Sequence, residues 1–455
     1  MYTRSFTPAF ANDLDAFIPE VWGQEALMVV EANVVMLPLV HKNFTKEIAR
    51  FGDVVNTRRP GKFHMIRKGR GAITKQDAAA TNVPIKLDQH WHVSFMLDDV
   101  DITMSMEDLL TTYLTPAVKA IARGTDQVLL AQRFQFMAHS VGALGTAIDK
   151  NTVIDLNTLM DDLDLPDSSR NVILTSKSKG DILKIDAFTK ADSINNEGRA
   201  LQEAEIGRVM GADWYRAQNN KNITSGNTLK TNAINNAAGY PIGATVLTVD
   251  GAGTPVSGEW CVINGKPYRI VAIGGGVTSI TLESPGLVEA VSDNDVVTTT
   301  TGGAINFGAG YEAETYIPIA WDGFDASNKP QNGSLVSIAT DTGYYGLLES
   351  SASYTTEGTL DRPLEVTCND NDVVGLGPNG SYNLAFHPEA IGFITRPLAT
   401  PPDGFGVRSA VINANGLAIR VTIGVDQTNQ QTIVTLDLLA GVEVFNANLG
   451  ALLYG

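Results

Sequence analysis

Hydrophobic and polar positions along this chain follow two different periods, which separate helical from strand-forming regions. The longest helical pattern covers about residues 107–141, where apolar residues recur every three or four positions. Pro116 and Gly124 are expected to kink this helix. A second helix is predicted within 19–40 and should end near Pro38.

A strand pattern covers residues 84–106, where side chains alternate with a period of two. One face carries His90, His92, Ser94 and Met96, and the other carries Trp91, Val93, Phe95 and Leu97. The apolar second face predicts that this strand covers a core with one side only.

Residues 150–220 combine helical and strand patterns. A short acidic helix is predicted over 156–163, an apolar strand over 171–175, a helix from Ser176 and a further helix before Glu203. This alternation indicates a mixed α/β unit.

From about 222 to 378 the pattern changes to short β-runs separated by glycine-rich turns, and acidic residues outnumber basic ones. The predicted strands are 245–249, 260–263, 268–273, 279–282 and 295–299. After residue 378, strands are predicted over 384–387, 417–425, 432–439 and 442–445. Because the mixed α/β pattern seen before residue 222 returns after residue 378, we interpret the β-rich stretch between them as an inserted all-β domain.

The segment from Arg58 to Lys75 contains seven cations and no acidic residue, and its Gly and Pro content predicts a hairpin or long loop. Like charges at this density repel one another unless something neutralises them. Three interpretations are open: a solvated loop, a contact with an acidic neighbouring subunit, or a contact with nucleic acid. The intersubunit interpretation is favoured, and its candidate residues are Arg58, Arg59, Lys62, Arg67, Lys68 and Arg70.

Composition limits the classes of function. The chain has 455 residues, 44% of them hydrophobic, which is enough for two or three packed cores. Its net charge of −17 argues against a protein that mainly grips phosphates. Cys261 and Cys368 support neither a disulfide framework nor a zinc site, and the first ten residues do not resemble a secretion signal. Cytoplasmic synthesis and no membrane span are therefore expected.

No catalytic motif stands out, so we predict no enzyme, no cofactor and no metal. Gly274–Gly276 lies between two β-runs and is expected to form a turn, not a phosphate cradle. His90 and His92 could begin a metal site, but no companion ligand has suitable spacing. Asp98, Asp99 and Asp101 lack the glycine and terminal glutamate of a calcium loop. A carbohydrate-active enzyme or a carbohydrate-binding protein with a β-rich domain remains the alternative.

Three short motifs, in this order, resemble the major capsid proteins of tailed double-stranded-DNA bacteriophages. They are Glu205-Ile206-Gly207-Arg208-Val209-Met210-Gly211-Ala212-Asp213-Trp214-Tyr215, then Asn383-Leu384-Ala385-Phe386-His387-Pro388-Glu389-Ala390 with Arg396-Pro397-Leu398, and then Leu436-Asp437-Leu438-Leu439-Ala440-Gly441-Val442. A β-domain between the first and second motifs is similar to the coat proteins of short-tailed phages with an inserted accessory domain. The insert itself matches nothing obvious.

The resemblance implies an α+β fold with an N-terminal arm, an extended loop, a peripheral domain with a long spine helix, and an axial domain. The implied ranges are 1–55 for the arm, 56–84 for the loop, 85–150 for the peripheral domain, 151–221 and 379–455 for the axial domain with the C-terminal strands, and 222–378 for the insert. It further implies self-assembly into the pentamers and hexamers of an icosahedral capsid that encloses DNA without reading its sequence. Expected partners are a scaffolding protein and a portal, with a decoration protein as a further candidate, and the expected location is the virion, assembled in the host cytoplasm.

Overall fold

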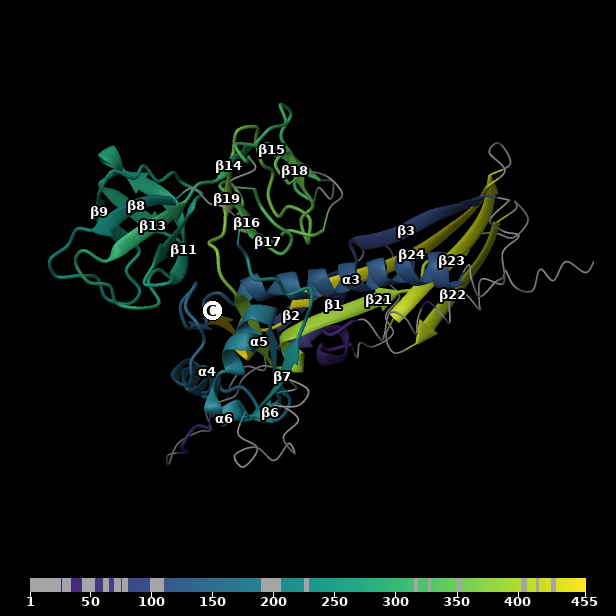
Figure 1. Ribbon diagram of the computed structural model, residues 1–455, viewed down its shortest axis with the longest axis horizontal. Coiled ribbons are helices and arrows are strands. Elements are labelled where there is room, and N and C mark those ends of the chain that lie inside the picture. The colour runs from purple at the N-terminus through teal and green to yellow at the C-terminus, as the bar shows by residue number, and fades with distance from the viewer. Residues whose placement is uncertain are drawn as a thin grey trace, which may run out of the picture.

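The computed structural model has the mixed α+β composition that the sequence predicts, with more strands than helices (Figure 1). It describes residues 26, 34–42, 54–59, 65–68, 75, 81–98, 110–189, 206–224, 229–314, 318–325, 329–349, 354–401, 407–414, 417–426 and 431–455. No helix among these residues is long and apolar enough to cross a membrane.

A long antiparallel sheet is built around β24 (Gln431–Val444). At one edge β24 pairs with β3 (Gln89–Asp98). At the other edge it pairs first with β23 (Leu417–Asp426) and then with β21 (Ile391–Arg396), and β22 (Val407–Ala414) continues the sheet beyond β23. The sheet therefore joins the segment before the long helix to the C-terminal third of the chain.

Two sequence predictions for this sheet have different outcomes. The alternation on β3 is confirmed, because His90, His92, Ser94 and Met96 are exposed while Leu97 is fully buried. The prediction of separate strands over 432–439 and 442–445 is wrong. Ala440 and Gly441 continue the pairing with β21, so a single strand forms without a turn.

The predicted long helix packs against this sheet. It consists of a π-helical segment (Leu110–Leu114), then α3 (Thr115–Ala131), then a 3-10 segment (Gln132–Phe136), so it ends before residue 141. Pro116 lies at the start of α3, directly after the π-helical segment, so the type of helix changes where the proline stands. Figure 1 shows α3 running beside β3 and β24.

Most of the helix predicted within residues 19–40 lies outside the described residues. Within it, Leu37–Leu39 forms one 3-10 turn. The side chain of Asp126 in α3 holds this segment, because its carboxylate accepts hydrogen bonds from the backbone N–H of Met36 (2.9 Å) and from Nδ2 of Asn219 (2.9 Å). Burial raises the pKa of Asp126 above its ordinary value.

The basic segment connects two paired strands, as a hairpin does. β1 (Val54–Arg59) and β2 (Thr81–Lys86) are antiparallel, with Val54 opposite Lys86 and Arg59 opposite Thr81. The base of this stem lies against β24, where a Cβ at Gly441 would meet the carbonyl oxygen of Lys86 at 2.5 Å. The prediction of a hairpin or long loop is therefore confirmed for the stem.

A sheet with both parallel and antiparallel pairs contains most strands of the unit that the sequence predicts as mixed α/β. Its order is β4 (Ser140–Val141), β25 (Gly450–Tyr454), β20 (Tyr382–Phe386), β5 (Arg170–Leu174), β7 (Ala212–Arg216) and β6 (Gly207–Val209). The helices of this unit are α4 (Lys150–Asp162), α5 (Ser176–Ile182) and α6 (Asp186–Thr189). Asp149 caps α4 by accepting from the N–H of Thr152 at 2.8 Å, so the helix begins earlier than predicted. The helix predicted before Glu203 lies outside the described residues.

The β-rich stretch forms two bodies with separate cores (Figure 1). The first, called the barrel below, is a closed barrel of β8 (Leu229–Ile234), β9 (Val246–Asp250), β10 (Trp260–Ile263), β11 (Lys266–Gly274), β12 (Ser279–Leu282) and β13 (Val296–Thr300). The predicted strands coincide with five of these six within a few residues. Gly275–Val277 forms the expected turn, with Gly276 at φ +72°.

The second body, called the sheet unit below, is a six-stranded sheet. It contains β14 (Gly303–Ile305), β15 (Ile319–Asp322), β16 (Leu335–Ile338), β17 (Tyr344–Gly346), β18 (Glu357–Gly358) and β19 (Val373–Leu376). Several hydrogen bonds connect it to the barrel. Among them, Nε1 of Trp260 donates to Oγ of Ser337 (2.8 Å), Oγ1 of Thr300 donates to the carbonyl of Leu376 (2.7 Å), and Nη2 of Arg269 donates to the carbonyl of Asp341 (2.6 Å).

The chain enters and leaves these two bodies at a single point. Ile223 and Gly380 face each other in an antiparallel bridge, and each backbone N–H donates to the other carbonyl at 3.0 Å. Gly380 has φ +147°, and a side chain there would meet Leu144. A segment whose two ends are hydrogen-bonded to each other interrupts the host fold very little.

The contact between the sheet unit and the end of α3 allows a prediction about Gly346. A Cβ at this position would lie 2.5 Å from Cβ of Ala131, which is held by the helix backbone. We expect Gly346→Ala to destabilise the protein by about 1–3 kcal/mol, measured by thermal or denaturant unfolding. Gly424→Ala is the matched control, because its nearest neighbour, Cγ2 of Val407, would be at 3.7 Å and the change should stay within about 0.5 kcal/mol. Equal effects of the two substitutions would contradict the prediction.

Candidate functional site

The described part of the basic segment is a highly exposed surface. Arg58 and Arg59 lie on β1, and Arg67 and Lys68 lie in the connection between β1 and β2, both exposed. Lys62 and Arg70 lie outside the described residues. The structure therefore places four of the six candidate residues on one hairpin.

Apolar side chains accompany these cations. Met65 is fully exposed (101%) and Ile66 is 48% exposed, directly before Arg67 and Lys68. A large apolar side chain in water gains about 1.5–3 kcal/mol when another surface covers it. This arrangement of apolar and cationic residues suits contact with an apolar surface that has an acidic rim.

The stem of the hairpin is joined to the sheet unit by a charge pair. Nζ of Lys86 on β2 lies 2.5 Å from Oε1 of Glu314, and both side chains are partly exposed. Solvent screening limits such a pair to at most about 1 kcal/mol. Burial raises the pKa of the neighbouring Asp88 to about 6, although the charge of Lys86 opposes this rise.

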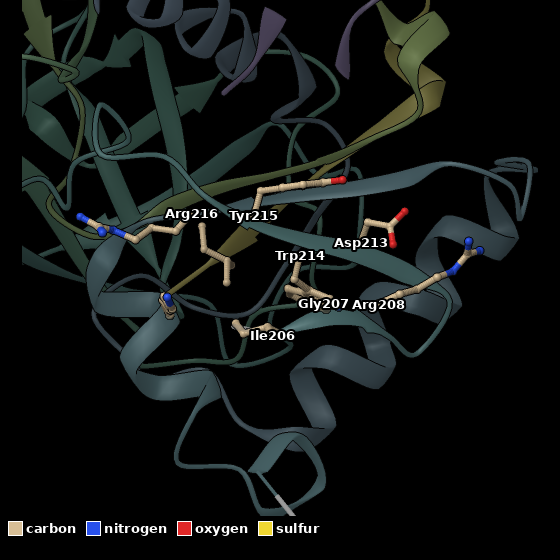
Figure 2. A pocket seen from close by; sticks show the side chains of 9 residues that line it. Ile206, Gly207, Arg208, Asp213, Trp214, Tyr215 and Arg216 are labelled. Carbon is tan, nitrogen blue, oxygen red and sulfur yellow. The ribbon is translucent and has the colours of Figure 1, made fainter. Parts of the chain in front are cut away.

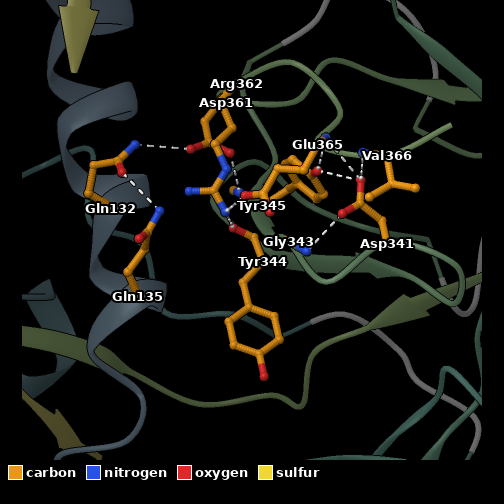
Figure 3. A network of polar contacts seen from close by, with 11 residues as sticks. Gln132, Gln135, Asp341, Gly343, Tyr344, Tyr345, Asp361, Arg362, Glu365 and Val366 are labelled. Atoms are coloured by element: carbon orange, nitrogen blue, oxygen red, sulfur yellow. Dashed lines mark hydrogen bonds and ion pairs between the residues drawn. The ribbon is translucent and has the colours of Figure 1, made fainter. Parts of the chain in front are cut away.

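A set of polar contacts joins the long helix to the sheet unit, and we call it the polar junction (Figure 3). Gln132 donates from Nε2 to Oδ2 of Asp361 at 3.2 Å, and the N–H of Gly346 donates to Oδ1 of Asp361 at 2.7 Å. Nε2 of Gln89 on β3 donates to the carbonyl of Asp361 at 3.1 Å. One acidic residue thus contacts the helix, the long sheet and its own sheet unit.

Glu349 makes the more exposed part of the polar junction. Its carboxylate lies 3.3 Å from Nη1 of Arg123 and accepts from Nε2 of Gln127 at 3.3 Å, while its N–H donates to Oε1 of Gln127 at 3.2 Å. These contacts come from successive turns of α3, so one side of the helix faces the sheet unit.

A further carboxylate organises the sheet unit behind the polar junction. Asp341 accepts at Oδ2 from the hydroxyl of Tyr345 (2.7 Å) and from the N–H groups of Glu365 (3.1 Å) and Val366 (3.3 Å). Its Oδ1 accepts from the N–H of Gly343 at 2.9 Å (Figure 3). The carboxylate of Asp341 is buried, and these bonds satisfy it while they hold the loop that carries Glu365 and Val366.

The first motif surrounds an open hollow of about 340 Å³ (Figure 2). Gly211, with φ +79°, lies in the tight turn between β6 and β7, and Gly207, with φ +66°, begins β6. Arg208 and Arg216 point to opposite sides in Figure 2, and Asp213 lies on the side of Arg208. Because the two guanidinium groups do not converge, this hollow has no common anion-binding centre.

Other residues considered for chemistry do not form a reactive group. His90 and His92 share a face of β3 with ring centroids 6.5 Å apart, and Nε2 of His90 lies 3.4 Å from Oδ1 of Asp437. Within the described ranges, no three His, Cys, Asp or Glu side chains come together as metal ligands would. Cys261 and Cys368 are buried and unpaired, and burial raises the pKa of the Cys368 thiol to about 11.

The polar junction was not predicted from the sequence. Gln89, Gln132 and Asp361 are separated by more than two hundred positions at the widest, and none belongs to a charge run or motif. In the sequence, only the high density of cations in the hairpin indicated a functional surface, and that surface is the exposed hairpin itself.

Asp361 allows a test of the polar junction by pH. Burial raises its pKa to about 6 in the folded protein, above its ordinary value of 3.8. The protonated form therefore contributes stability that is fully present below about pH 4 and is lost as the pH rises through 6. In Asp361→Asn this pH dependence should disappear. The difference in unfolding free energy between wild type and variant should therefore change by about 3 kcal/mol between pH 4 and pH 8. Asp162→Asn, which removes an exposed carboxylate, is the control; parallel curves for wild type and Asp361→Asn would refute the assignment.

Comparison with known proteins gives structural neighbours only. The sequence matches no protein family model and no curated protein. A structure from Mycobacterium phage Che8 is similar with a TM-score of 0.39 and 11% identity, over 88% of this chain and 84% of that chain. "Capsid structure of the Cyanophage P-SCSP1u" is similar with a TM-score of 0.40 and 13% identity, over 90% and 84%. "Asymmetric unit of bacteriophage PhiM1 mature capsid" has a TM-score of 0.37 and 10% identity, over 91% and 89%.

Proposed function

We propose that this chain is the major capsid protein of a tailed double-stranded-DNA bacteriophage, a structural subunit without enzymatic activity. The observation that supports this most is the position of the three motifs in the fold. The first and second lie on β7 and β20, which flank β5 in one sheet. The second continues through the turn Pro388–Ala390 into β21, which pairs with the third motif on β24.

The second motif contains a tight turn. Pro388 begins only a single 3-10 turn, and β21 follows at Ile391. This turn changes the direction of the chain between the two sheets. The motifs therefore mark the connection between a mixed sheet and a long antiparallel sheet, which is a structural role and not a catalytic one.

Assembly itself is proposed to use the extended parts of the molecule. The long sheet with α3 reaches away from the mixed sheet, so it can bury area on neighbouring copies (Figure 1). The connection between β1 and β2 adds the exposed residues 65–68. Rings of five and six copies would close an icosahedral shell around DNA. Many modest interfaces add up to a stable shell while single errors remain reversible.

The remaining partners follow from this role. A scaffolding protein, a portal and a decoration protein would act during assembly in the bacterial cytoplasm, and the product would be the virion. The acidic chain would enclose DNA without reading its sequence. Membership of the short-tailed branch rests on the β-rich stretch between the first and second motifs.

The division into an arm, a loop, a peripheral domain, an axial domain and an insert is part of the proposal. The bridge between Ile223 and Gly380 supports the insertion, because residues 224–379 can be removed without separating the host strands. No observation on the described residues favours a carbohydrate-active enzyme or a carbohydrate-binding protein.

The intersubunit role of the basic hairpin can be tested by reversing charge. We expect the double substitution Arg67→Glu with Lys68→Glu to weaken one interface by about tenfold, or about 1.4 kcal/mol, because attraction to an acidic neighbour becomes repulsion. Shell yield and the salt concentration that dissociates shells, followed by electron microscopy and sedimentation, should both fall. Lys150→Glu with Lys221→Glu makes the same change of charge at exposed positions elsewhere. Unchanged yield and salt tolerance in the first variant would remove the hairpin from the interface.

The role of the insert can be tested by deletion. Replacing residues 224–379 with Asn-Gly joins the bridged positions Ile223 and Gly380 through a two-residue hairpin turn. If the barrel and the sheet unit contact neighbouring rings, this variant should give misassembled or wrongly sized shells in electron micrographs. Circular dichroism would verify that the remaining chain folds, and normal particles would refute the role.

A further inference from the structure

The barrel and the sheet unit repeat the same short sequences in the same order along the chain. Residues 234–240 of the barrel read INNAAGY, and residues 305–311 of the sheet unit read INFGAGY. Further on, residues 293–297 and residues 370–374 both read DNDVV. Two motifs that recur in order within one chain indicate an internal repeat.

The hydrogen bonds of the two bodies agree with this repeat. The hydroxyl of Tyr240 accepts from the backbone N–H of Thr248 on β9 at 2.9 Å. The hydroxyl of Tyr311, which ends the same motif in the sheet unit, accepts from the backbone N–H of Ala320 on β15 at 2.8 Å. Each motif therefore contacts the next strand of its own body in the same way.

The strands correspond as well. The N–H of Gly258 before β10 donates to the carbonyl of Ile270, and that of Gly333 before β16 donates to the carbonyl of Leu347, both at 2.7 Å. The order β11-β10-β13-β8-β9-β12 in the barrel corresponds to β17-β16-β19-β14-β15-β18 in the sheet unit. The barrel closes between β11 and β12, whereas an isolated bridge between Leu347 and Leu360 stands at the corresponding place in the sheet unit. The β-rich stretch is thus one module that occurs twice.

Both modules use the same carboxylate position to bind the next body. Glu283, directly after β12, accepts from the hydroxyl of Tyr344 in the sheet unit at 2.6 Å. Asp361, which follows Thr-Leu in the sheet unit as Glu283 does in the barrel, accepts from Nε2 of Gln132 in the long helix at 3.2 Å. The barrel is therefore placed on the sheet unit, and the sheet unit on the helix, in a head-to-tail arrangement.

The sheet unit receives the barrel on the side of β16 and β19 that faces away from its own core. Val336 and Ile338 line that core, and Ser337 between them accepts from Nε1 of Trp260 at 2.8 Å. Ser337 pairs with Gly375 on β19, and a Cβ at Gly375 would meet the ring of Trp260. In the second module this surface is therefore a protein contact.

The equivalent surface of the barrel faces solvent. Val262 and Thr298 occupy the places of Ser337 and Gly375, and they pair with each other in the same way. The surface continues onto β8, and we call it the free face, which consists of Thr231, Ala233, Val262, Val296 and Thr298. Val296 is 55% exposed. The residues that alternate with these along the three strands belong to the barrel core: Ile234, Cys261, Ile263 and Val297.

The free face suits a partner of a different shape from Trp260. Thr298 and Val262 carry more side-chain atoms than Gly375 and Ser337, so an indole ring has no room to approach the backbone here. All members except Ala233 are β-branched and stand on neighbouring strands. Such a surface packs well against another flat sheet face.

The charge of the chain narrows the choice of partner. No member of the free face is charged, although the chain has a net charge of −17. Two copies repel each other on average, and this repulsion is weakest where uncharged surfaces meet. Asp250, opposite Ala233 on β9, is exposed at the rim, where water screens its charge. An uncharged centre with a polar rim is typical of protein interfaces, and two identical faces provide it on both sides.

We propose that the free face binds the same face of a second copy of this chain. The two copies meet about a two-fold axis, with Thr298 on the central strand next to its own counterpart. The proposal rests on the proposed capsid function and names the surface by which the inserted domain joins neighbouring subunits. The contact does not require a closed shell, so it can also be measured on free subunits.

A disulfide at the centre of the contact tests it directly. In Thr298→Cys, the two thiols should form a disulfide-linked dimer of the full chain under oxidising conditions, seen on a non-reducing gel. This dimer should form in assembled shells and in concentrated free subunits. Cys261 and Cys368 are buried, so they do not compete for oxidation. Val271→Cys is the control and should stay monomeric, because Val271 is 43% exposed on β11, outside the free face.

A charge at the same position gives a second test. In Thr298→Glu, like charges oppose each other across the contact, so the association constant of the full chain, measured by sedimentation, should fall at least about tenfold. Val271→Glu should leave it unchanged. Both positions lie on the barrel surface, and circular dichroism verifies that the variants fold.

Three results would overturn the proposal: equal crosslinking of Thr298→Cys and Val271→Cys, absence of the dimer from both shells and free subunits, or a disulfide to a different polypeptide. Normal shells in any of these cases would leave the capsid function intact. If no shells form, the capsid function fails, while a disulfide dimer of free subunits would still support this contact.

Discussion

The two-sided pairing of β24 is the interaction on which the rest of this structure depends. Leu438 and Leu439 each pair with β3 at one edge and with a C-terminal strand at the other. Because every backbone group of a central strand has a partner, neither edge of β24 can slip without losing a row of hydrogen bonds. This pairing fixes β3, and β3 in turn gives α3 an apolar face to cover. The hairpin stem is also positioned there, through the close approach of Lys86 to Gly441.

The two β-rich bodies depend on a different kind of contact. Their strands close around their own cores, so they need little from the rest of the chain to fold. Polar groups help to place them: Asp361 and Glu349 at the helix, and Lys266 of the barrel, whose Nζ donates to the carbonyl of Ser140 at 3.2 Å. Trp260 and Leu335 add apolar contacts, because both pack into the core beside the long helix. Polar contacts require matched donors and acceptors, so they specify one orientation where an apolar surface would permit several.

Charge is distributed in a way that suits contact between identical copies. The chain is strongly acidic, yet its hairpin combines exposed cations with the exposed side chains of Met65 and Ile66. The cations of such a segment repel one another, and the net negative charge of another copy attracts them. The long sheet holds the base of the hairpin, so its exposed part extends from a rigid support. A flexible attachment would lose more conformational entropy on binding.

The sequence alone determined the elements whose pattern is local. The alternation on β3, the buried run of β5, most barrel strands and the cationic hairpin were predictable, because neighbouring residues decide periodicity and charge density. Only the tertiary structure decided that β24 is one strand, that the barrel closes, and that Gln89 and Gln132 meet Asp361. Pro116 shows the difference at one residue: its missing N–H predicts an irregular helix, but only the structure shows that a π-helical segment precedes α3 there. Contacts between distant segments depend on which surfaces pack together. That packing minimises the free energy of the whole chain, and a short stretch of sequence does not contain this information.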